Sequence, residues 1–372
     1  DDFFDLGGTS LLSVDLCAQI ERRFGKKLPL TAILEAPTVE RLARLVAEDP
    51  AAGRDSLVPI RPGGDGPPLF LVHDGDGETM LYRNLALRLK PEHAVYGLQP
   101  LSRGEAPIAH TRIPEMAAHH VDRIRSVQPK GPYLVGGMCA GGVLAFEVAR
   151  QLQAEGEAVA MVALLDAADV AAPAKAWRVA RGRAQSFAAV FRPDPSARPG
   201  RRALAILARA ARKARNLAVY ETGTRLAALR DGLRFRLLRH YLDRGKRLPR
   251  WLERIPVRTV YQLAERDYHP SGRFDGELVL FRATAGSGAV NDEPFIERYE
   301  DPLLGWGRRA TRGVRVLDVP GGHSSMLQEP NVRVLAQQMQ AYLDAALAPG
   351  PSLALESRSG FSLTLRECQA KA

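Results

Sequence analysis

The fold is decided by a stretch in the middle of the chain, Pro132-Tyr133-Leu134-Val135-Gly136-Gly137-Met138-Cys139-Ala140-Gly141-Gly142. Its first half predicts a buried strand, and the apolar residues that follow predict a helix. Between them lies G-x-C-x-G, the pattern of a nucleophile elbow with cysteine in the usual place of serine. The glycines permit a strained turn, and the N-terminus of the next helix favours a thiolate. The sequence therefore predicts Cys139 as a catalytic nucleophile.

Around this stretch, short apolar runs alternate with helical patterns along the chain. Such alternation predicts a mostly parallel, doubly wound sheet. The expected strands are 69–73, 94–98, 133–136, 159–165, 278–281 and 314–319. The expected helices are 81–89, 114–127, 142–155 and 332–346.

The block 170–255 interrupts this alternation. Two apolar stripes at helical spacing, 204–218 and 226–241, predict an all-helical insertion. Because insertions between strands often cover the carboxyl ends of the strands, where ligands bind, we expect a lid. Lys175–Arg254 holds 22 Lys and Arg against 5 Asp and Glu. This charge predicts either a solvated helical face or a field that attracts an anionic substrate.

A catalytic cysteine needs a base, which is expected late in the chain. His323 follows the last predicted strand on a glycine-rich loop that can reach the elbow, whereas His73, which ends the first strand, comes early. Two acids compete to orient the base. Asp166 ends the strand after the elbow helix, while Asp292, or its neighbour Glu293, follows the next strand. Asp166 ends a strand at the catalytic edge of the sheet and is preferred.

Acyl transfer also needs an oxyanion hole made of two backbone N–H groups. Ala140 directly follows the nucleophile and supplies one, and the loop 73–77 supplies the other, which we assign to Gly75. The loop also carries Asp74 and Asp76, but no further ligand cluster accompanies them, so no metal is expected.

Composition narrows the class of protein. The chain has 372 residues, a formal charge of +10 and three cysteines. Three cysteines are too few for a disulfide scaffold, and such a small number is typical of a cytoplasmic protein. No apolar run is long enough to span a membrane, and no zinc-finger or RNA-binding pattern occurs, so neither a membrane nor a nucleic acid is an expected partner. The first residues lack Met and a signal peptide, which indicates a fragment of a longer polypeptide.

These features resemble a known family. Residues 68–346 are similar to the thioesterase domain that ends nonribosomal peptide synthetases. Five separated segments carry the resemblance in the same order, namely 128–137, 145–152, 280–283, 304–306 and 320–323. The resemblance implies an α/β-hydrolase fold with a helical lid. It supports Asp166, because in this family the acid follows the strand after the elbow.

The segment 1–48 resembles the C-terminal part of a small helical carrier domain. Phe3–Leu11 matches the phosphopantetheine attachment motif, which implies a covalent 4'-phosphopantetheine on Ser10. A serine at a helix start suits this role, because backbone N–H groups meet the phosphate, although a simple N-cap also explains it. Thr9 stands where histidine is common, and the first carrier helix is missing. The implied partners are a phosphopantetheinyl transferase, upstream synthetase modules and a tethered peptide.

The expected organisation is a partial carrier domain (1–48), a linker (49–66), a thioesterase domain (67–347) and a tail (348–372) without an assigned role. A thioester on Cys139 keeps more activation than an oxygen ester, so release by cyclisation is favoured over hydrolysis. The resemblance implies that the product includes a strained β-lactam or β-lactone ring, because cysteine members of this family are associated with such rings. Two alternatives are a stand-alone cysteine-dependent α/β-hydrolase and a non-catalytic docking module whose elbow has decayed.

Overall fold

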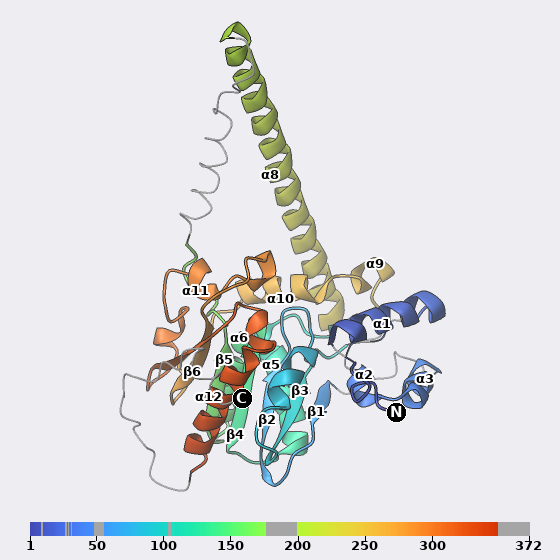
Figure 1. Cartoon of the computed structure of the whole chain (residues 1–372), viewed down its shortest axis with the longest axis vertical. Coiled ribbons are helices and arrows are strands. Elements are labelled where there is room, and N and C mark those ends of the chain that lie inside the picture. The colour runs from blue at the N-terminus through green and yellow to red at the C-terminus, as the bar shows by residue number, and fades with distance from the viewer. Residues whose placement is uncertain are drawn as a thin grey trace.

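The fold is built around one seven-stranded sheet. A computed structural model describes residues 1–8, 10–26, 28, 30, 32–47, 56–102, 106, 108–175 and 199–348. The strands are β1 (Leu57–Arg61), β2 (Gly66–Val72), β3 (His93–Leu98), β4 (Tyr133–Met138), β5 (Val159–Leu165), β6 (Leu278–Ala283) and β7 (Val314–Val319). Their order is β1-β3-β2-β4-β5-β6-β7 (Figure 1), and all neighbours pair in parallel except β1 and β3. This is the doubly wound sheet that the alternating pattern predicts.

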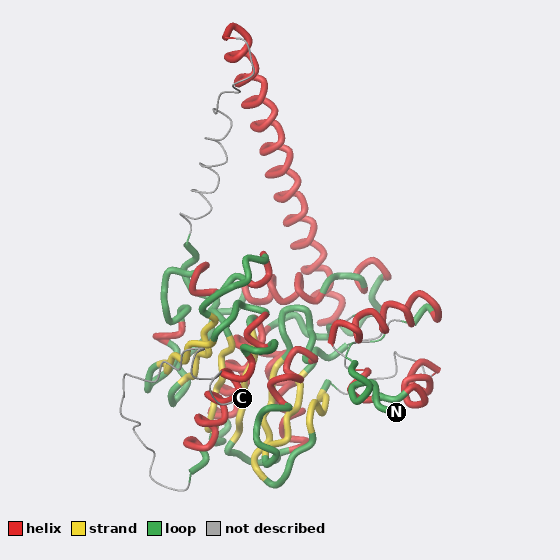
Figure 2. Tube along the Cα trace, in the orientation of Figure 1, coloured by secondary structure: helices red, strands yellow, loops and turns green. Residues whose placement is uncertain are grey.

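Helices cover both faces of the sheet (Figure 2). One apolar cluster joins α5 (Ile113–Val127) and α6 (Ala140–Ala154) to sheet residues such as Phe70 and Val72. A second joins α4 (Arg83–Ala86) and α12 (Val332–Ala346) to the opposite face. Because successive strand residues point to opposite faces and both faces are covered, the central strands are apolar throughout. Short 3-10 helices complete this part, namely η1 (Met80–Tyr82), η3 (Val290–Asp292), η4 (Trp306–Arg308) and η5 (Ser325–Leu327).

Strand β1 corrects the linker prediction. It lies within 49–66, where composition predicts only a linker, yet it pairs with β3 at the edge of the sheet. Val58 and Ile60 are buried, whereas Pro59 between them is exposed. Proline lacks a backbone N–H but is tolerated in an edge strand. The Pro and Gly content of this segment therefore indicates a linker, although the segment contains a strand. Residues 48–55 lie outside the described part of the chain.

The lid region is helical, as the two apolar stripes predict, and both stripes lie on one long helix. Helix α8 (Pro199–Asp243) has 45 residues, and Figure 1 shows it extending away from the sheet. Only its C-terminal end packs on the body, where Phe235, Leu238 and Leu242 are buried. Helices α9 (Arg250–Glu253) and α10 (Val257–Arg266) follow, and α11 (Phe295–Arg298) lies beyond β6. Residues 176–198 of the expected lid lie outside the described residues.

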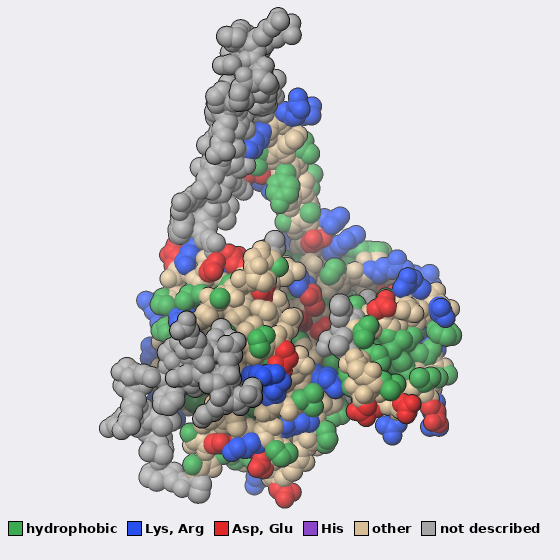
Figure 3. Space-filling view, viewed as in Figure 1, with side chains coloured by type: hydrophobic (Ala, Val, Ile, Leu, Met, Phe, Trp, Pro, Cys, Tyr) green, Lys and Arg blue, Asp and Glu red, His purple; other side chains and the backbone are tan. Residues whose placement is uncertain are grey.

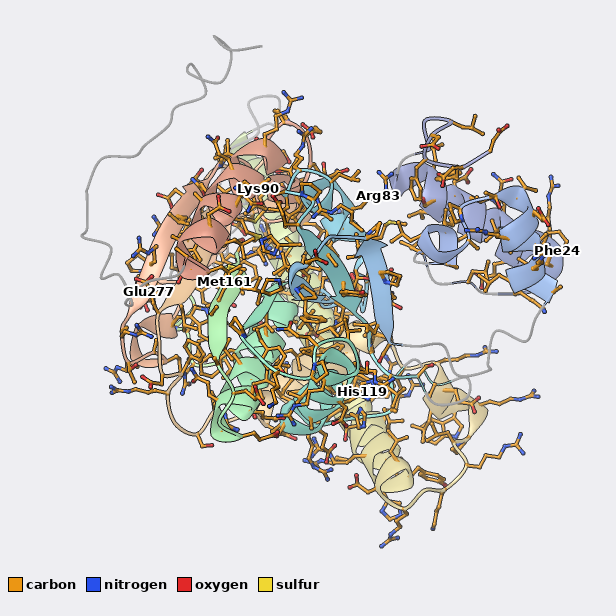
Figure 4. All side chains as sticks on the ribbon, turned by 90° about the horizontal axis from the view of Figure 1, so that it is seen from below. Phe24, Arg83, Lys90, His119, Met161 and Glu277 are labelled. Carbon is orange, nitrogen blue, oxygen red and sulfur yellow. The ribbon has the colours of Figure 1, made fainter. Side chains whose placement is uncertain are left out.

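The N-terminal segment forms a small helical unit beside β1. Its helices are α1 (Ser10–Phe24), α2 (Ala32–Glu35) and α3 (Val39–Ala47). They enclose a small apolar core that includes Cys17, Ile20 and Ile33. Helix α2 contacts β1. The Arg83 guanidinium lies over the Phe4 ring, 3.9 Å from its centroid, and Figure 4 shows Arg83 between the sheet and this unit.

Candidate active site

The turn between β4 and α6, which we call the elbow (residues 137–141), holds Cys139 in a strained backbone conformation. Its φ of 55° and ψ of −122° fall where residues other than glycine are rare. The backbones around it are very close. A Cβ at Gly137 would lie 2.3 Å from Gly141, and a Cβ at Gly141 would lie 2.3 Å from the carbonyl oxygen of His73. Both positions therefore require glycine, as the G-x-C-x-G pattern predicts.

We expect Gly141→Ala to destabilise the protein by about 1–3 kcal/mol or more, because the added methyl group would overlap the backbone at His73. Gly223→Ala is the matched control. Gly223 lies in the exposed part of α8 with open space around it, so this variant is expected to gain about 0.5–1 kcal/mol of stability. The thermal unfolding midpoints of the two variants are expected to shift in opposite directions, down for Gly141→Ala and up for Gly223→Ala. An unchanged midpoint for Gly141→Ala would contradict the close approach.

The structure brings His323 and Asp166 together with Cys139. The Nδ1 atom of His323 lies 2.7 Å from Oδ2 of Asp166, and the Cys139 side chain is close enough to His323 to raise the pKa of the imidazole. Burial lowers the pKa of His323, but the hydrogen bond to Asp166 and the negative charges of Asp166 and Cys139 raise it to about 9. His323, on the loop after β7, therefore lies between Cys139 in the elbow and Asp166 at the end of β5.

The carboxylate of Asp166 is fixed from two sides. It is fully buried, and it accepts the backbone N–H groups of Ala283 at 3.3 Å and Phe295 at 3.1 Å. The Phe295 ring also stacks on the His323 imidazole, with ring centroids 4.3 Å apart and planes 9° from parallel. Backbone bonds therefore hold the acid, and an aromatic face limits rotation of the imidazole. Sequence reasoning did not identify Phe295.

Asp292, the competing acid, makes a different set of contacts. Its carboxylate accepts the backbone N–H groups of Ser287, Ser324 and Ser325 and two of the serine hydroxyls, at 2.8–3.1 Å. Burial raises the pKa of Asp292, but the bonds from Ser287 and Ser325 hold it well below its usual range. Its carbonyl oxygen accepts the backbone N–H of His323 at 3.1 Å. Asp292 therefore orders the loop that carries His323, whereas Asp166 contacts the ring.

Gly75 and Ala140 lie close together beside Cys139. A Cβ at Gly75 would lie 4.0 Å from the Ala140 Cβ. Within the described residues, neither backbone N–H donates to a protein acceptor. The loop is shaped by Asp74, whose carboxylate accepts the N–H groups of Asp76 at 2.9 Å and Glu78 at 3.1 Å. Both amides are thus available to a ligand oxygen. Across the described part of the chain, no group of His, Cys, Asp and Glu could hold a metal ion.

His73 is a structural residue in this arrangement. Its Nδ1 lies 2.6 Å from the carbonyl oxygen of Asp74, and its Nε2 lies 2.7 Å from the hydroxyl of Tyr261 on α10. Burial lowers the pKa of His73 to about 4, so the ring is neutral. Arg258, also on α10, donates from Nε to Asp76 at 2.7 Å. These two contacts, which the sequence does not reveal, attach α10 to the loop of Gly75.

Helix α8, which Figure 1 shows projecting away from the sheet, holds half of the Lys and Arg residues of the segment 175–254. Helix α8 carries eleven Lys and Arg against three Asp and Glu. Figure 3 shows Lys and Arg side chains along the projecting helix. This placement favours a solvated helical face over a field that attracts an anionic substrate.

Comparison with known proteins identifies both parts of the chain. The thioesterase domain family matches residues 67–341, and the phosphopantetheine attachment site matches residues 1–46. A dimodular nonribosomal peptide synthase of Bacillus subtilis (strain 168) is 41% identical over 168 residues, which are 45% of this chain and 7% of that protein. Chondramide synthase cmdD of Chondromyces crocatus is 29% identical over 375 residues, covering 92% of this chain and 8% of that protein.

The crystal structure of holo-AB3403, a four-domain nonribosomal peptide synthetase bound to AMP and glycine, matches with a TM-score of 0.53 and 26% identity. The match covers 94% of this chain and 24% of that chain. The chain therefore spans less than a tenth of the two synthetases compared by sequence and about a quarter of this one. No helix in the described residues is long and apolar enough to cross a membrane.

These matches confirm the α/β-hydrolase fold, the preceding carrier segment and the covalent phosphopantetheine expected on it. Ser10 fits such a group, because it begins the 15-residue helix α1, and the positive end of a helix dipole favours a phosphate. The side chain of Ser10 lies outside the described part of the structure. The chain belongs to the thioesterase domain family, in the form that follows a phosphopantetheine carrier segment in nonribosomal peptide synthetases.

Proposed function

We propose that this chain releases a peptide from a synthetase by accepting the peptidyl group on Cys139. The observation that carries the proposal is the arrangement of Cys139, His323 and Asp166, with a 2.7 Å bond between the last two. A nucleophile, a base and an acid in this order are the parts that acyl transfer requires. The phosphopantetheine carried by Ser10 would supply the peptide as a thioester, and upstream synthetase modules and a phosphopantetheinyl transferase are the expected partners.

In the first step, the Cys139 thiol gives its proton to His323, and the sulfur attacks the thioester carbonyl carbon. The N–H groups of Ala140 and Gly75, which have no protein acceptor among the described residues, hold the oxygen as it becomes negative. The bond from that carbon to the sulfur of the donor breaks, and His323 gives its proton to this sulfur. Asp166 accepts the Nδ1–H of His323 and keeps the imidazole oriented throughout.

In the second step, a nucleophile attacks the acyl group on Cys139. His323, now neutral, accepts its proton, and the carbon–sulfur bond to Cys139 breaks. An amine or hydroxyl of the same peptide gives a ring, while water gives a free acid. A cysteine thioester is more activated than an ester, which supports cyclisation, including a strained β-lactam or β-lactone ring. Hydrolytic release is the alternative outcome.

Two other functions are less well supported. A stand-alone cysteine-dependent hydrolase acts on a diffusible substrate and needs no phosphopantetheine. Residues 1–46, however, match the phosphopantetheine attachment site, which argues against this function. A non-catalytic docking module does not require His323 to bond Asp166 and to lie close to the elbow cysteine, as it does here.

Mass spectrometry tests the proposal. The full chain is incubated with short peptidyl thioesters that carry an internal amine or hydroxyl, and the product and the intact protein are weighed. A product lighter than the free acid by one water, with an acyl group on Cys139, supports cyclising release. Free acid with the same acyl-enzyme indicates hydrolysis. Absence of both product and acyl-enzyme with every substrate would favour the docking module.

A further inference from the structure

One face of α10 lies over the candidate active site. Arg258, Tyr261 and Glu265 are spaced i, i+3 and i+7, so their side chains share one side of the helix. The first two are anchored at the end of β2, since Arg258 bonds to Asp76 and Tyr261 bonds to His73. Glu265 continues this face by one further turn.

The carboxylate of Glu265 has no cation to pair with among the described residues. Its side chain is partly buried, and no hydrogen bond or ion pair with another described residue engages it. Burial raises the pKa of this carboxyl to about 7. Arg258, which shares this face of α10, is engaged by Asp76. A partly desolvated carboxylate without a partner is unfavourable unless a ligand supplies the opposite charge.

Tyr299 connects Glu265 to the nucleophile. It follows α11, and its ring lies against Phe295 with centroids 5.4 Å apart. Burial raises the pKa of Tyr299, and the negative charges of Cys139 and Glu265 raise it further. The Tyr299 hydroxyl therefore lies within electrostatic range of both groups. Tyr299 packs on Phe295, which stacks on the His323 ring, and Glu265 lies on the face of α10 that contacts the loop of Gly75.

We propose that Glu265 recognises a positively charged amine on the peptidyl group while that group is on Cys139. The proposal rests on the proposed function and adds the class of substrate, which is a peptidyl thioester with a basic side chain or a free N-terminal amine. It differs from the anionic substrate that the net charge of 175–254 suggests, because half of the Lys and Arg residues of that segment lie on α8, which projects away from the sheet (Figure 1).

The test compares two peptidyl thioesters that differ in one group, a free amine or the same amine acetylated. The wild-type chain is expected to prefer the free amine by about tenfold or more in kcat/KM, the size of a charge-assisted hydrogen bond. In Glu265→Gln the ratio is expected to fall toward one, and in Glu265→Asp a part of it is expected to remain. Glu253→Gln on α9 removes the same charge from the lid away from this face and is expected to keep the wild-type ratio.

The pH dependence of this ratio is a second readout. Glu265 is ionised above about pH 7, so the preference for the amine is expected to decline as the pH falls through about 7. Burial raises the pKa of Tyr261 and Tyr299 above the usual value, His73 has a pKa of about 4 and His323 of about 9. None of these neighbours titrates near 7, so Glu265→Gln is expected to show a flat ratio there.

The outcomes separate the two proposals. If neither thioester forms an acyl-enzyme on Cys139, the proposed function fails. If both acylate Cys139 but the wild-type chain shows no preference for the amine, or Glu265→Gln keeps it, only the role of Glu265 is overturned.

Discussion

Replacing Cys139 by alanine is expected to slow peptide release from a peptidyl thioester by about 10⁴-fold or more, as expected for loss of the nucleophile of a catalytic triad. The elbow places this sulfur beside His323 and next to the amides of Ala140 and Gly75. No other described cysteine can replace it, since Cys17 is buried in the core of the carrier segment. Single-turnover kinetics and the intact mass of the protein measure the loss of both product and acyl-enzyme.

Two further variants separate loss of the nucleophile from general damage. Cys17→Ala removes a thiol far from the elbow and is expected to leave turnover of a diffusible thioester unchanged. Cys139→Ser keeps a nucleophile but makes an oxygen ester, so we expect an acyl-enzyme that reacts more slowly with amines and a larger share of free acid. Wild-type rates in Cys139→Ala would place the nucleophile elsewhere and refute the mechanism.

The central strands and the elbow could be predicted because their signals are local. Residues 133–142 combine a buried strand, a turn that needs glycine and the start of a helix within one short stretch. Asp166 follows β5 and His323 follows β7. Because parallel strands end at the same edge of the sheet, both residues are expected near the elbow. Continuous apolar runs identify the inner strands because helices cover both faces of the sheet.

Other features depend on tertiary contacts that no local pattern encodes. Asp166 and Asp292 each follow a strand, and only the structure shows that Asp166 bonds to the ring of His323 while Asp292 bonds to its loop. Similarly, the sequence of α10 does not say which face lies over the site. Glu265 was therefore not predicted, although Arg258 and Tyr261 on the same face fix its direction.

Helix α8 continues through a segment of low helix propensity. The segment between the two apolar stripes contains Thr222, Gly223 and Thr224, residues that lower helix propensity. In the structure, the threonine hydroxyls donate to backbone carbonyls of the preceding turn, at 2.7 Å to Ala218 and 2.9 Å to Tyr220. These bonds satisfy the hydroxyls within the helix, so the helix continues through the segment.

Asp166→Asn is expected to lower kcat for release by about 10⁴-fold, the size seen when the acid of a triad becomes an amide. The Asp166 carboxylate accepts three bonds, from His323, Ala283 and Phe295. An amide has one acceptor oxygen and one donor nitrogen, so its NH₂ group must face one of these N–H donors and at least one bond is lost. The imidazole then loses the partner that fixes its orientation. Asp318→Asn, which changes an exposed acid on β7, is the matched control and is expected to keep wild-type kcat.

The same substitution also predicts a change in titration. The bond to Asp166 and the negative charges of Asp166 and Cys139 raise the pKa of His323 to about 9, so their stabilisation is fully present below the ordinary pKa of 6.5 and is lost as the pH rises through about 9. In Asp166→Asn the pKa of His323 is expected to fall toward 6.5, and the free energy of unfolding to fall more at pH 7 than at pH 10. NMR titration of the His323 ring measures the pKa directly. A value that stays near 9 in the variant would mean that Cys139 alone holds the imidazolium, and Asp166 would then lose its role in the mechanism.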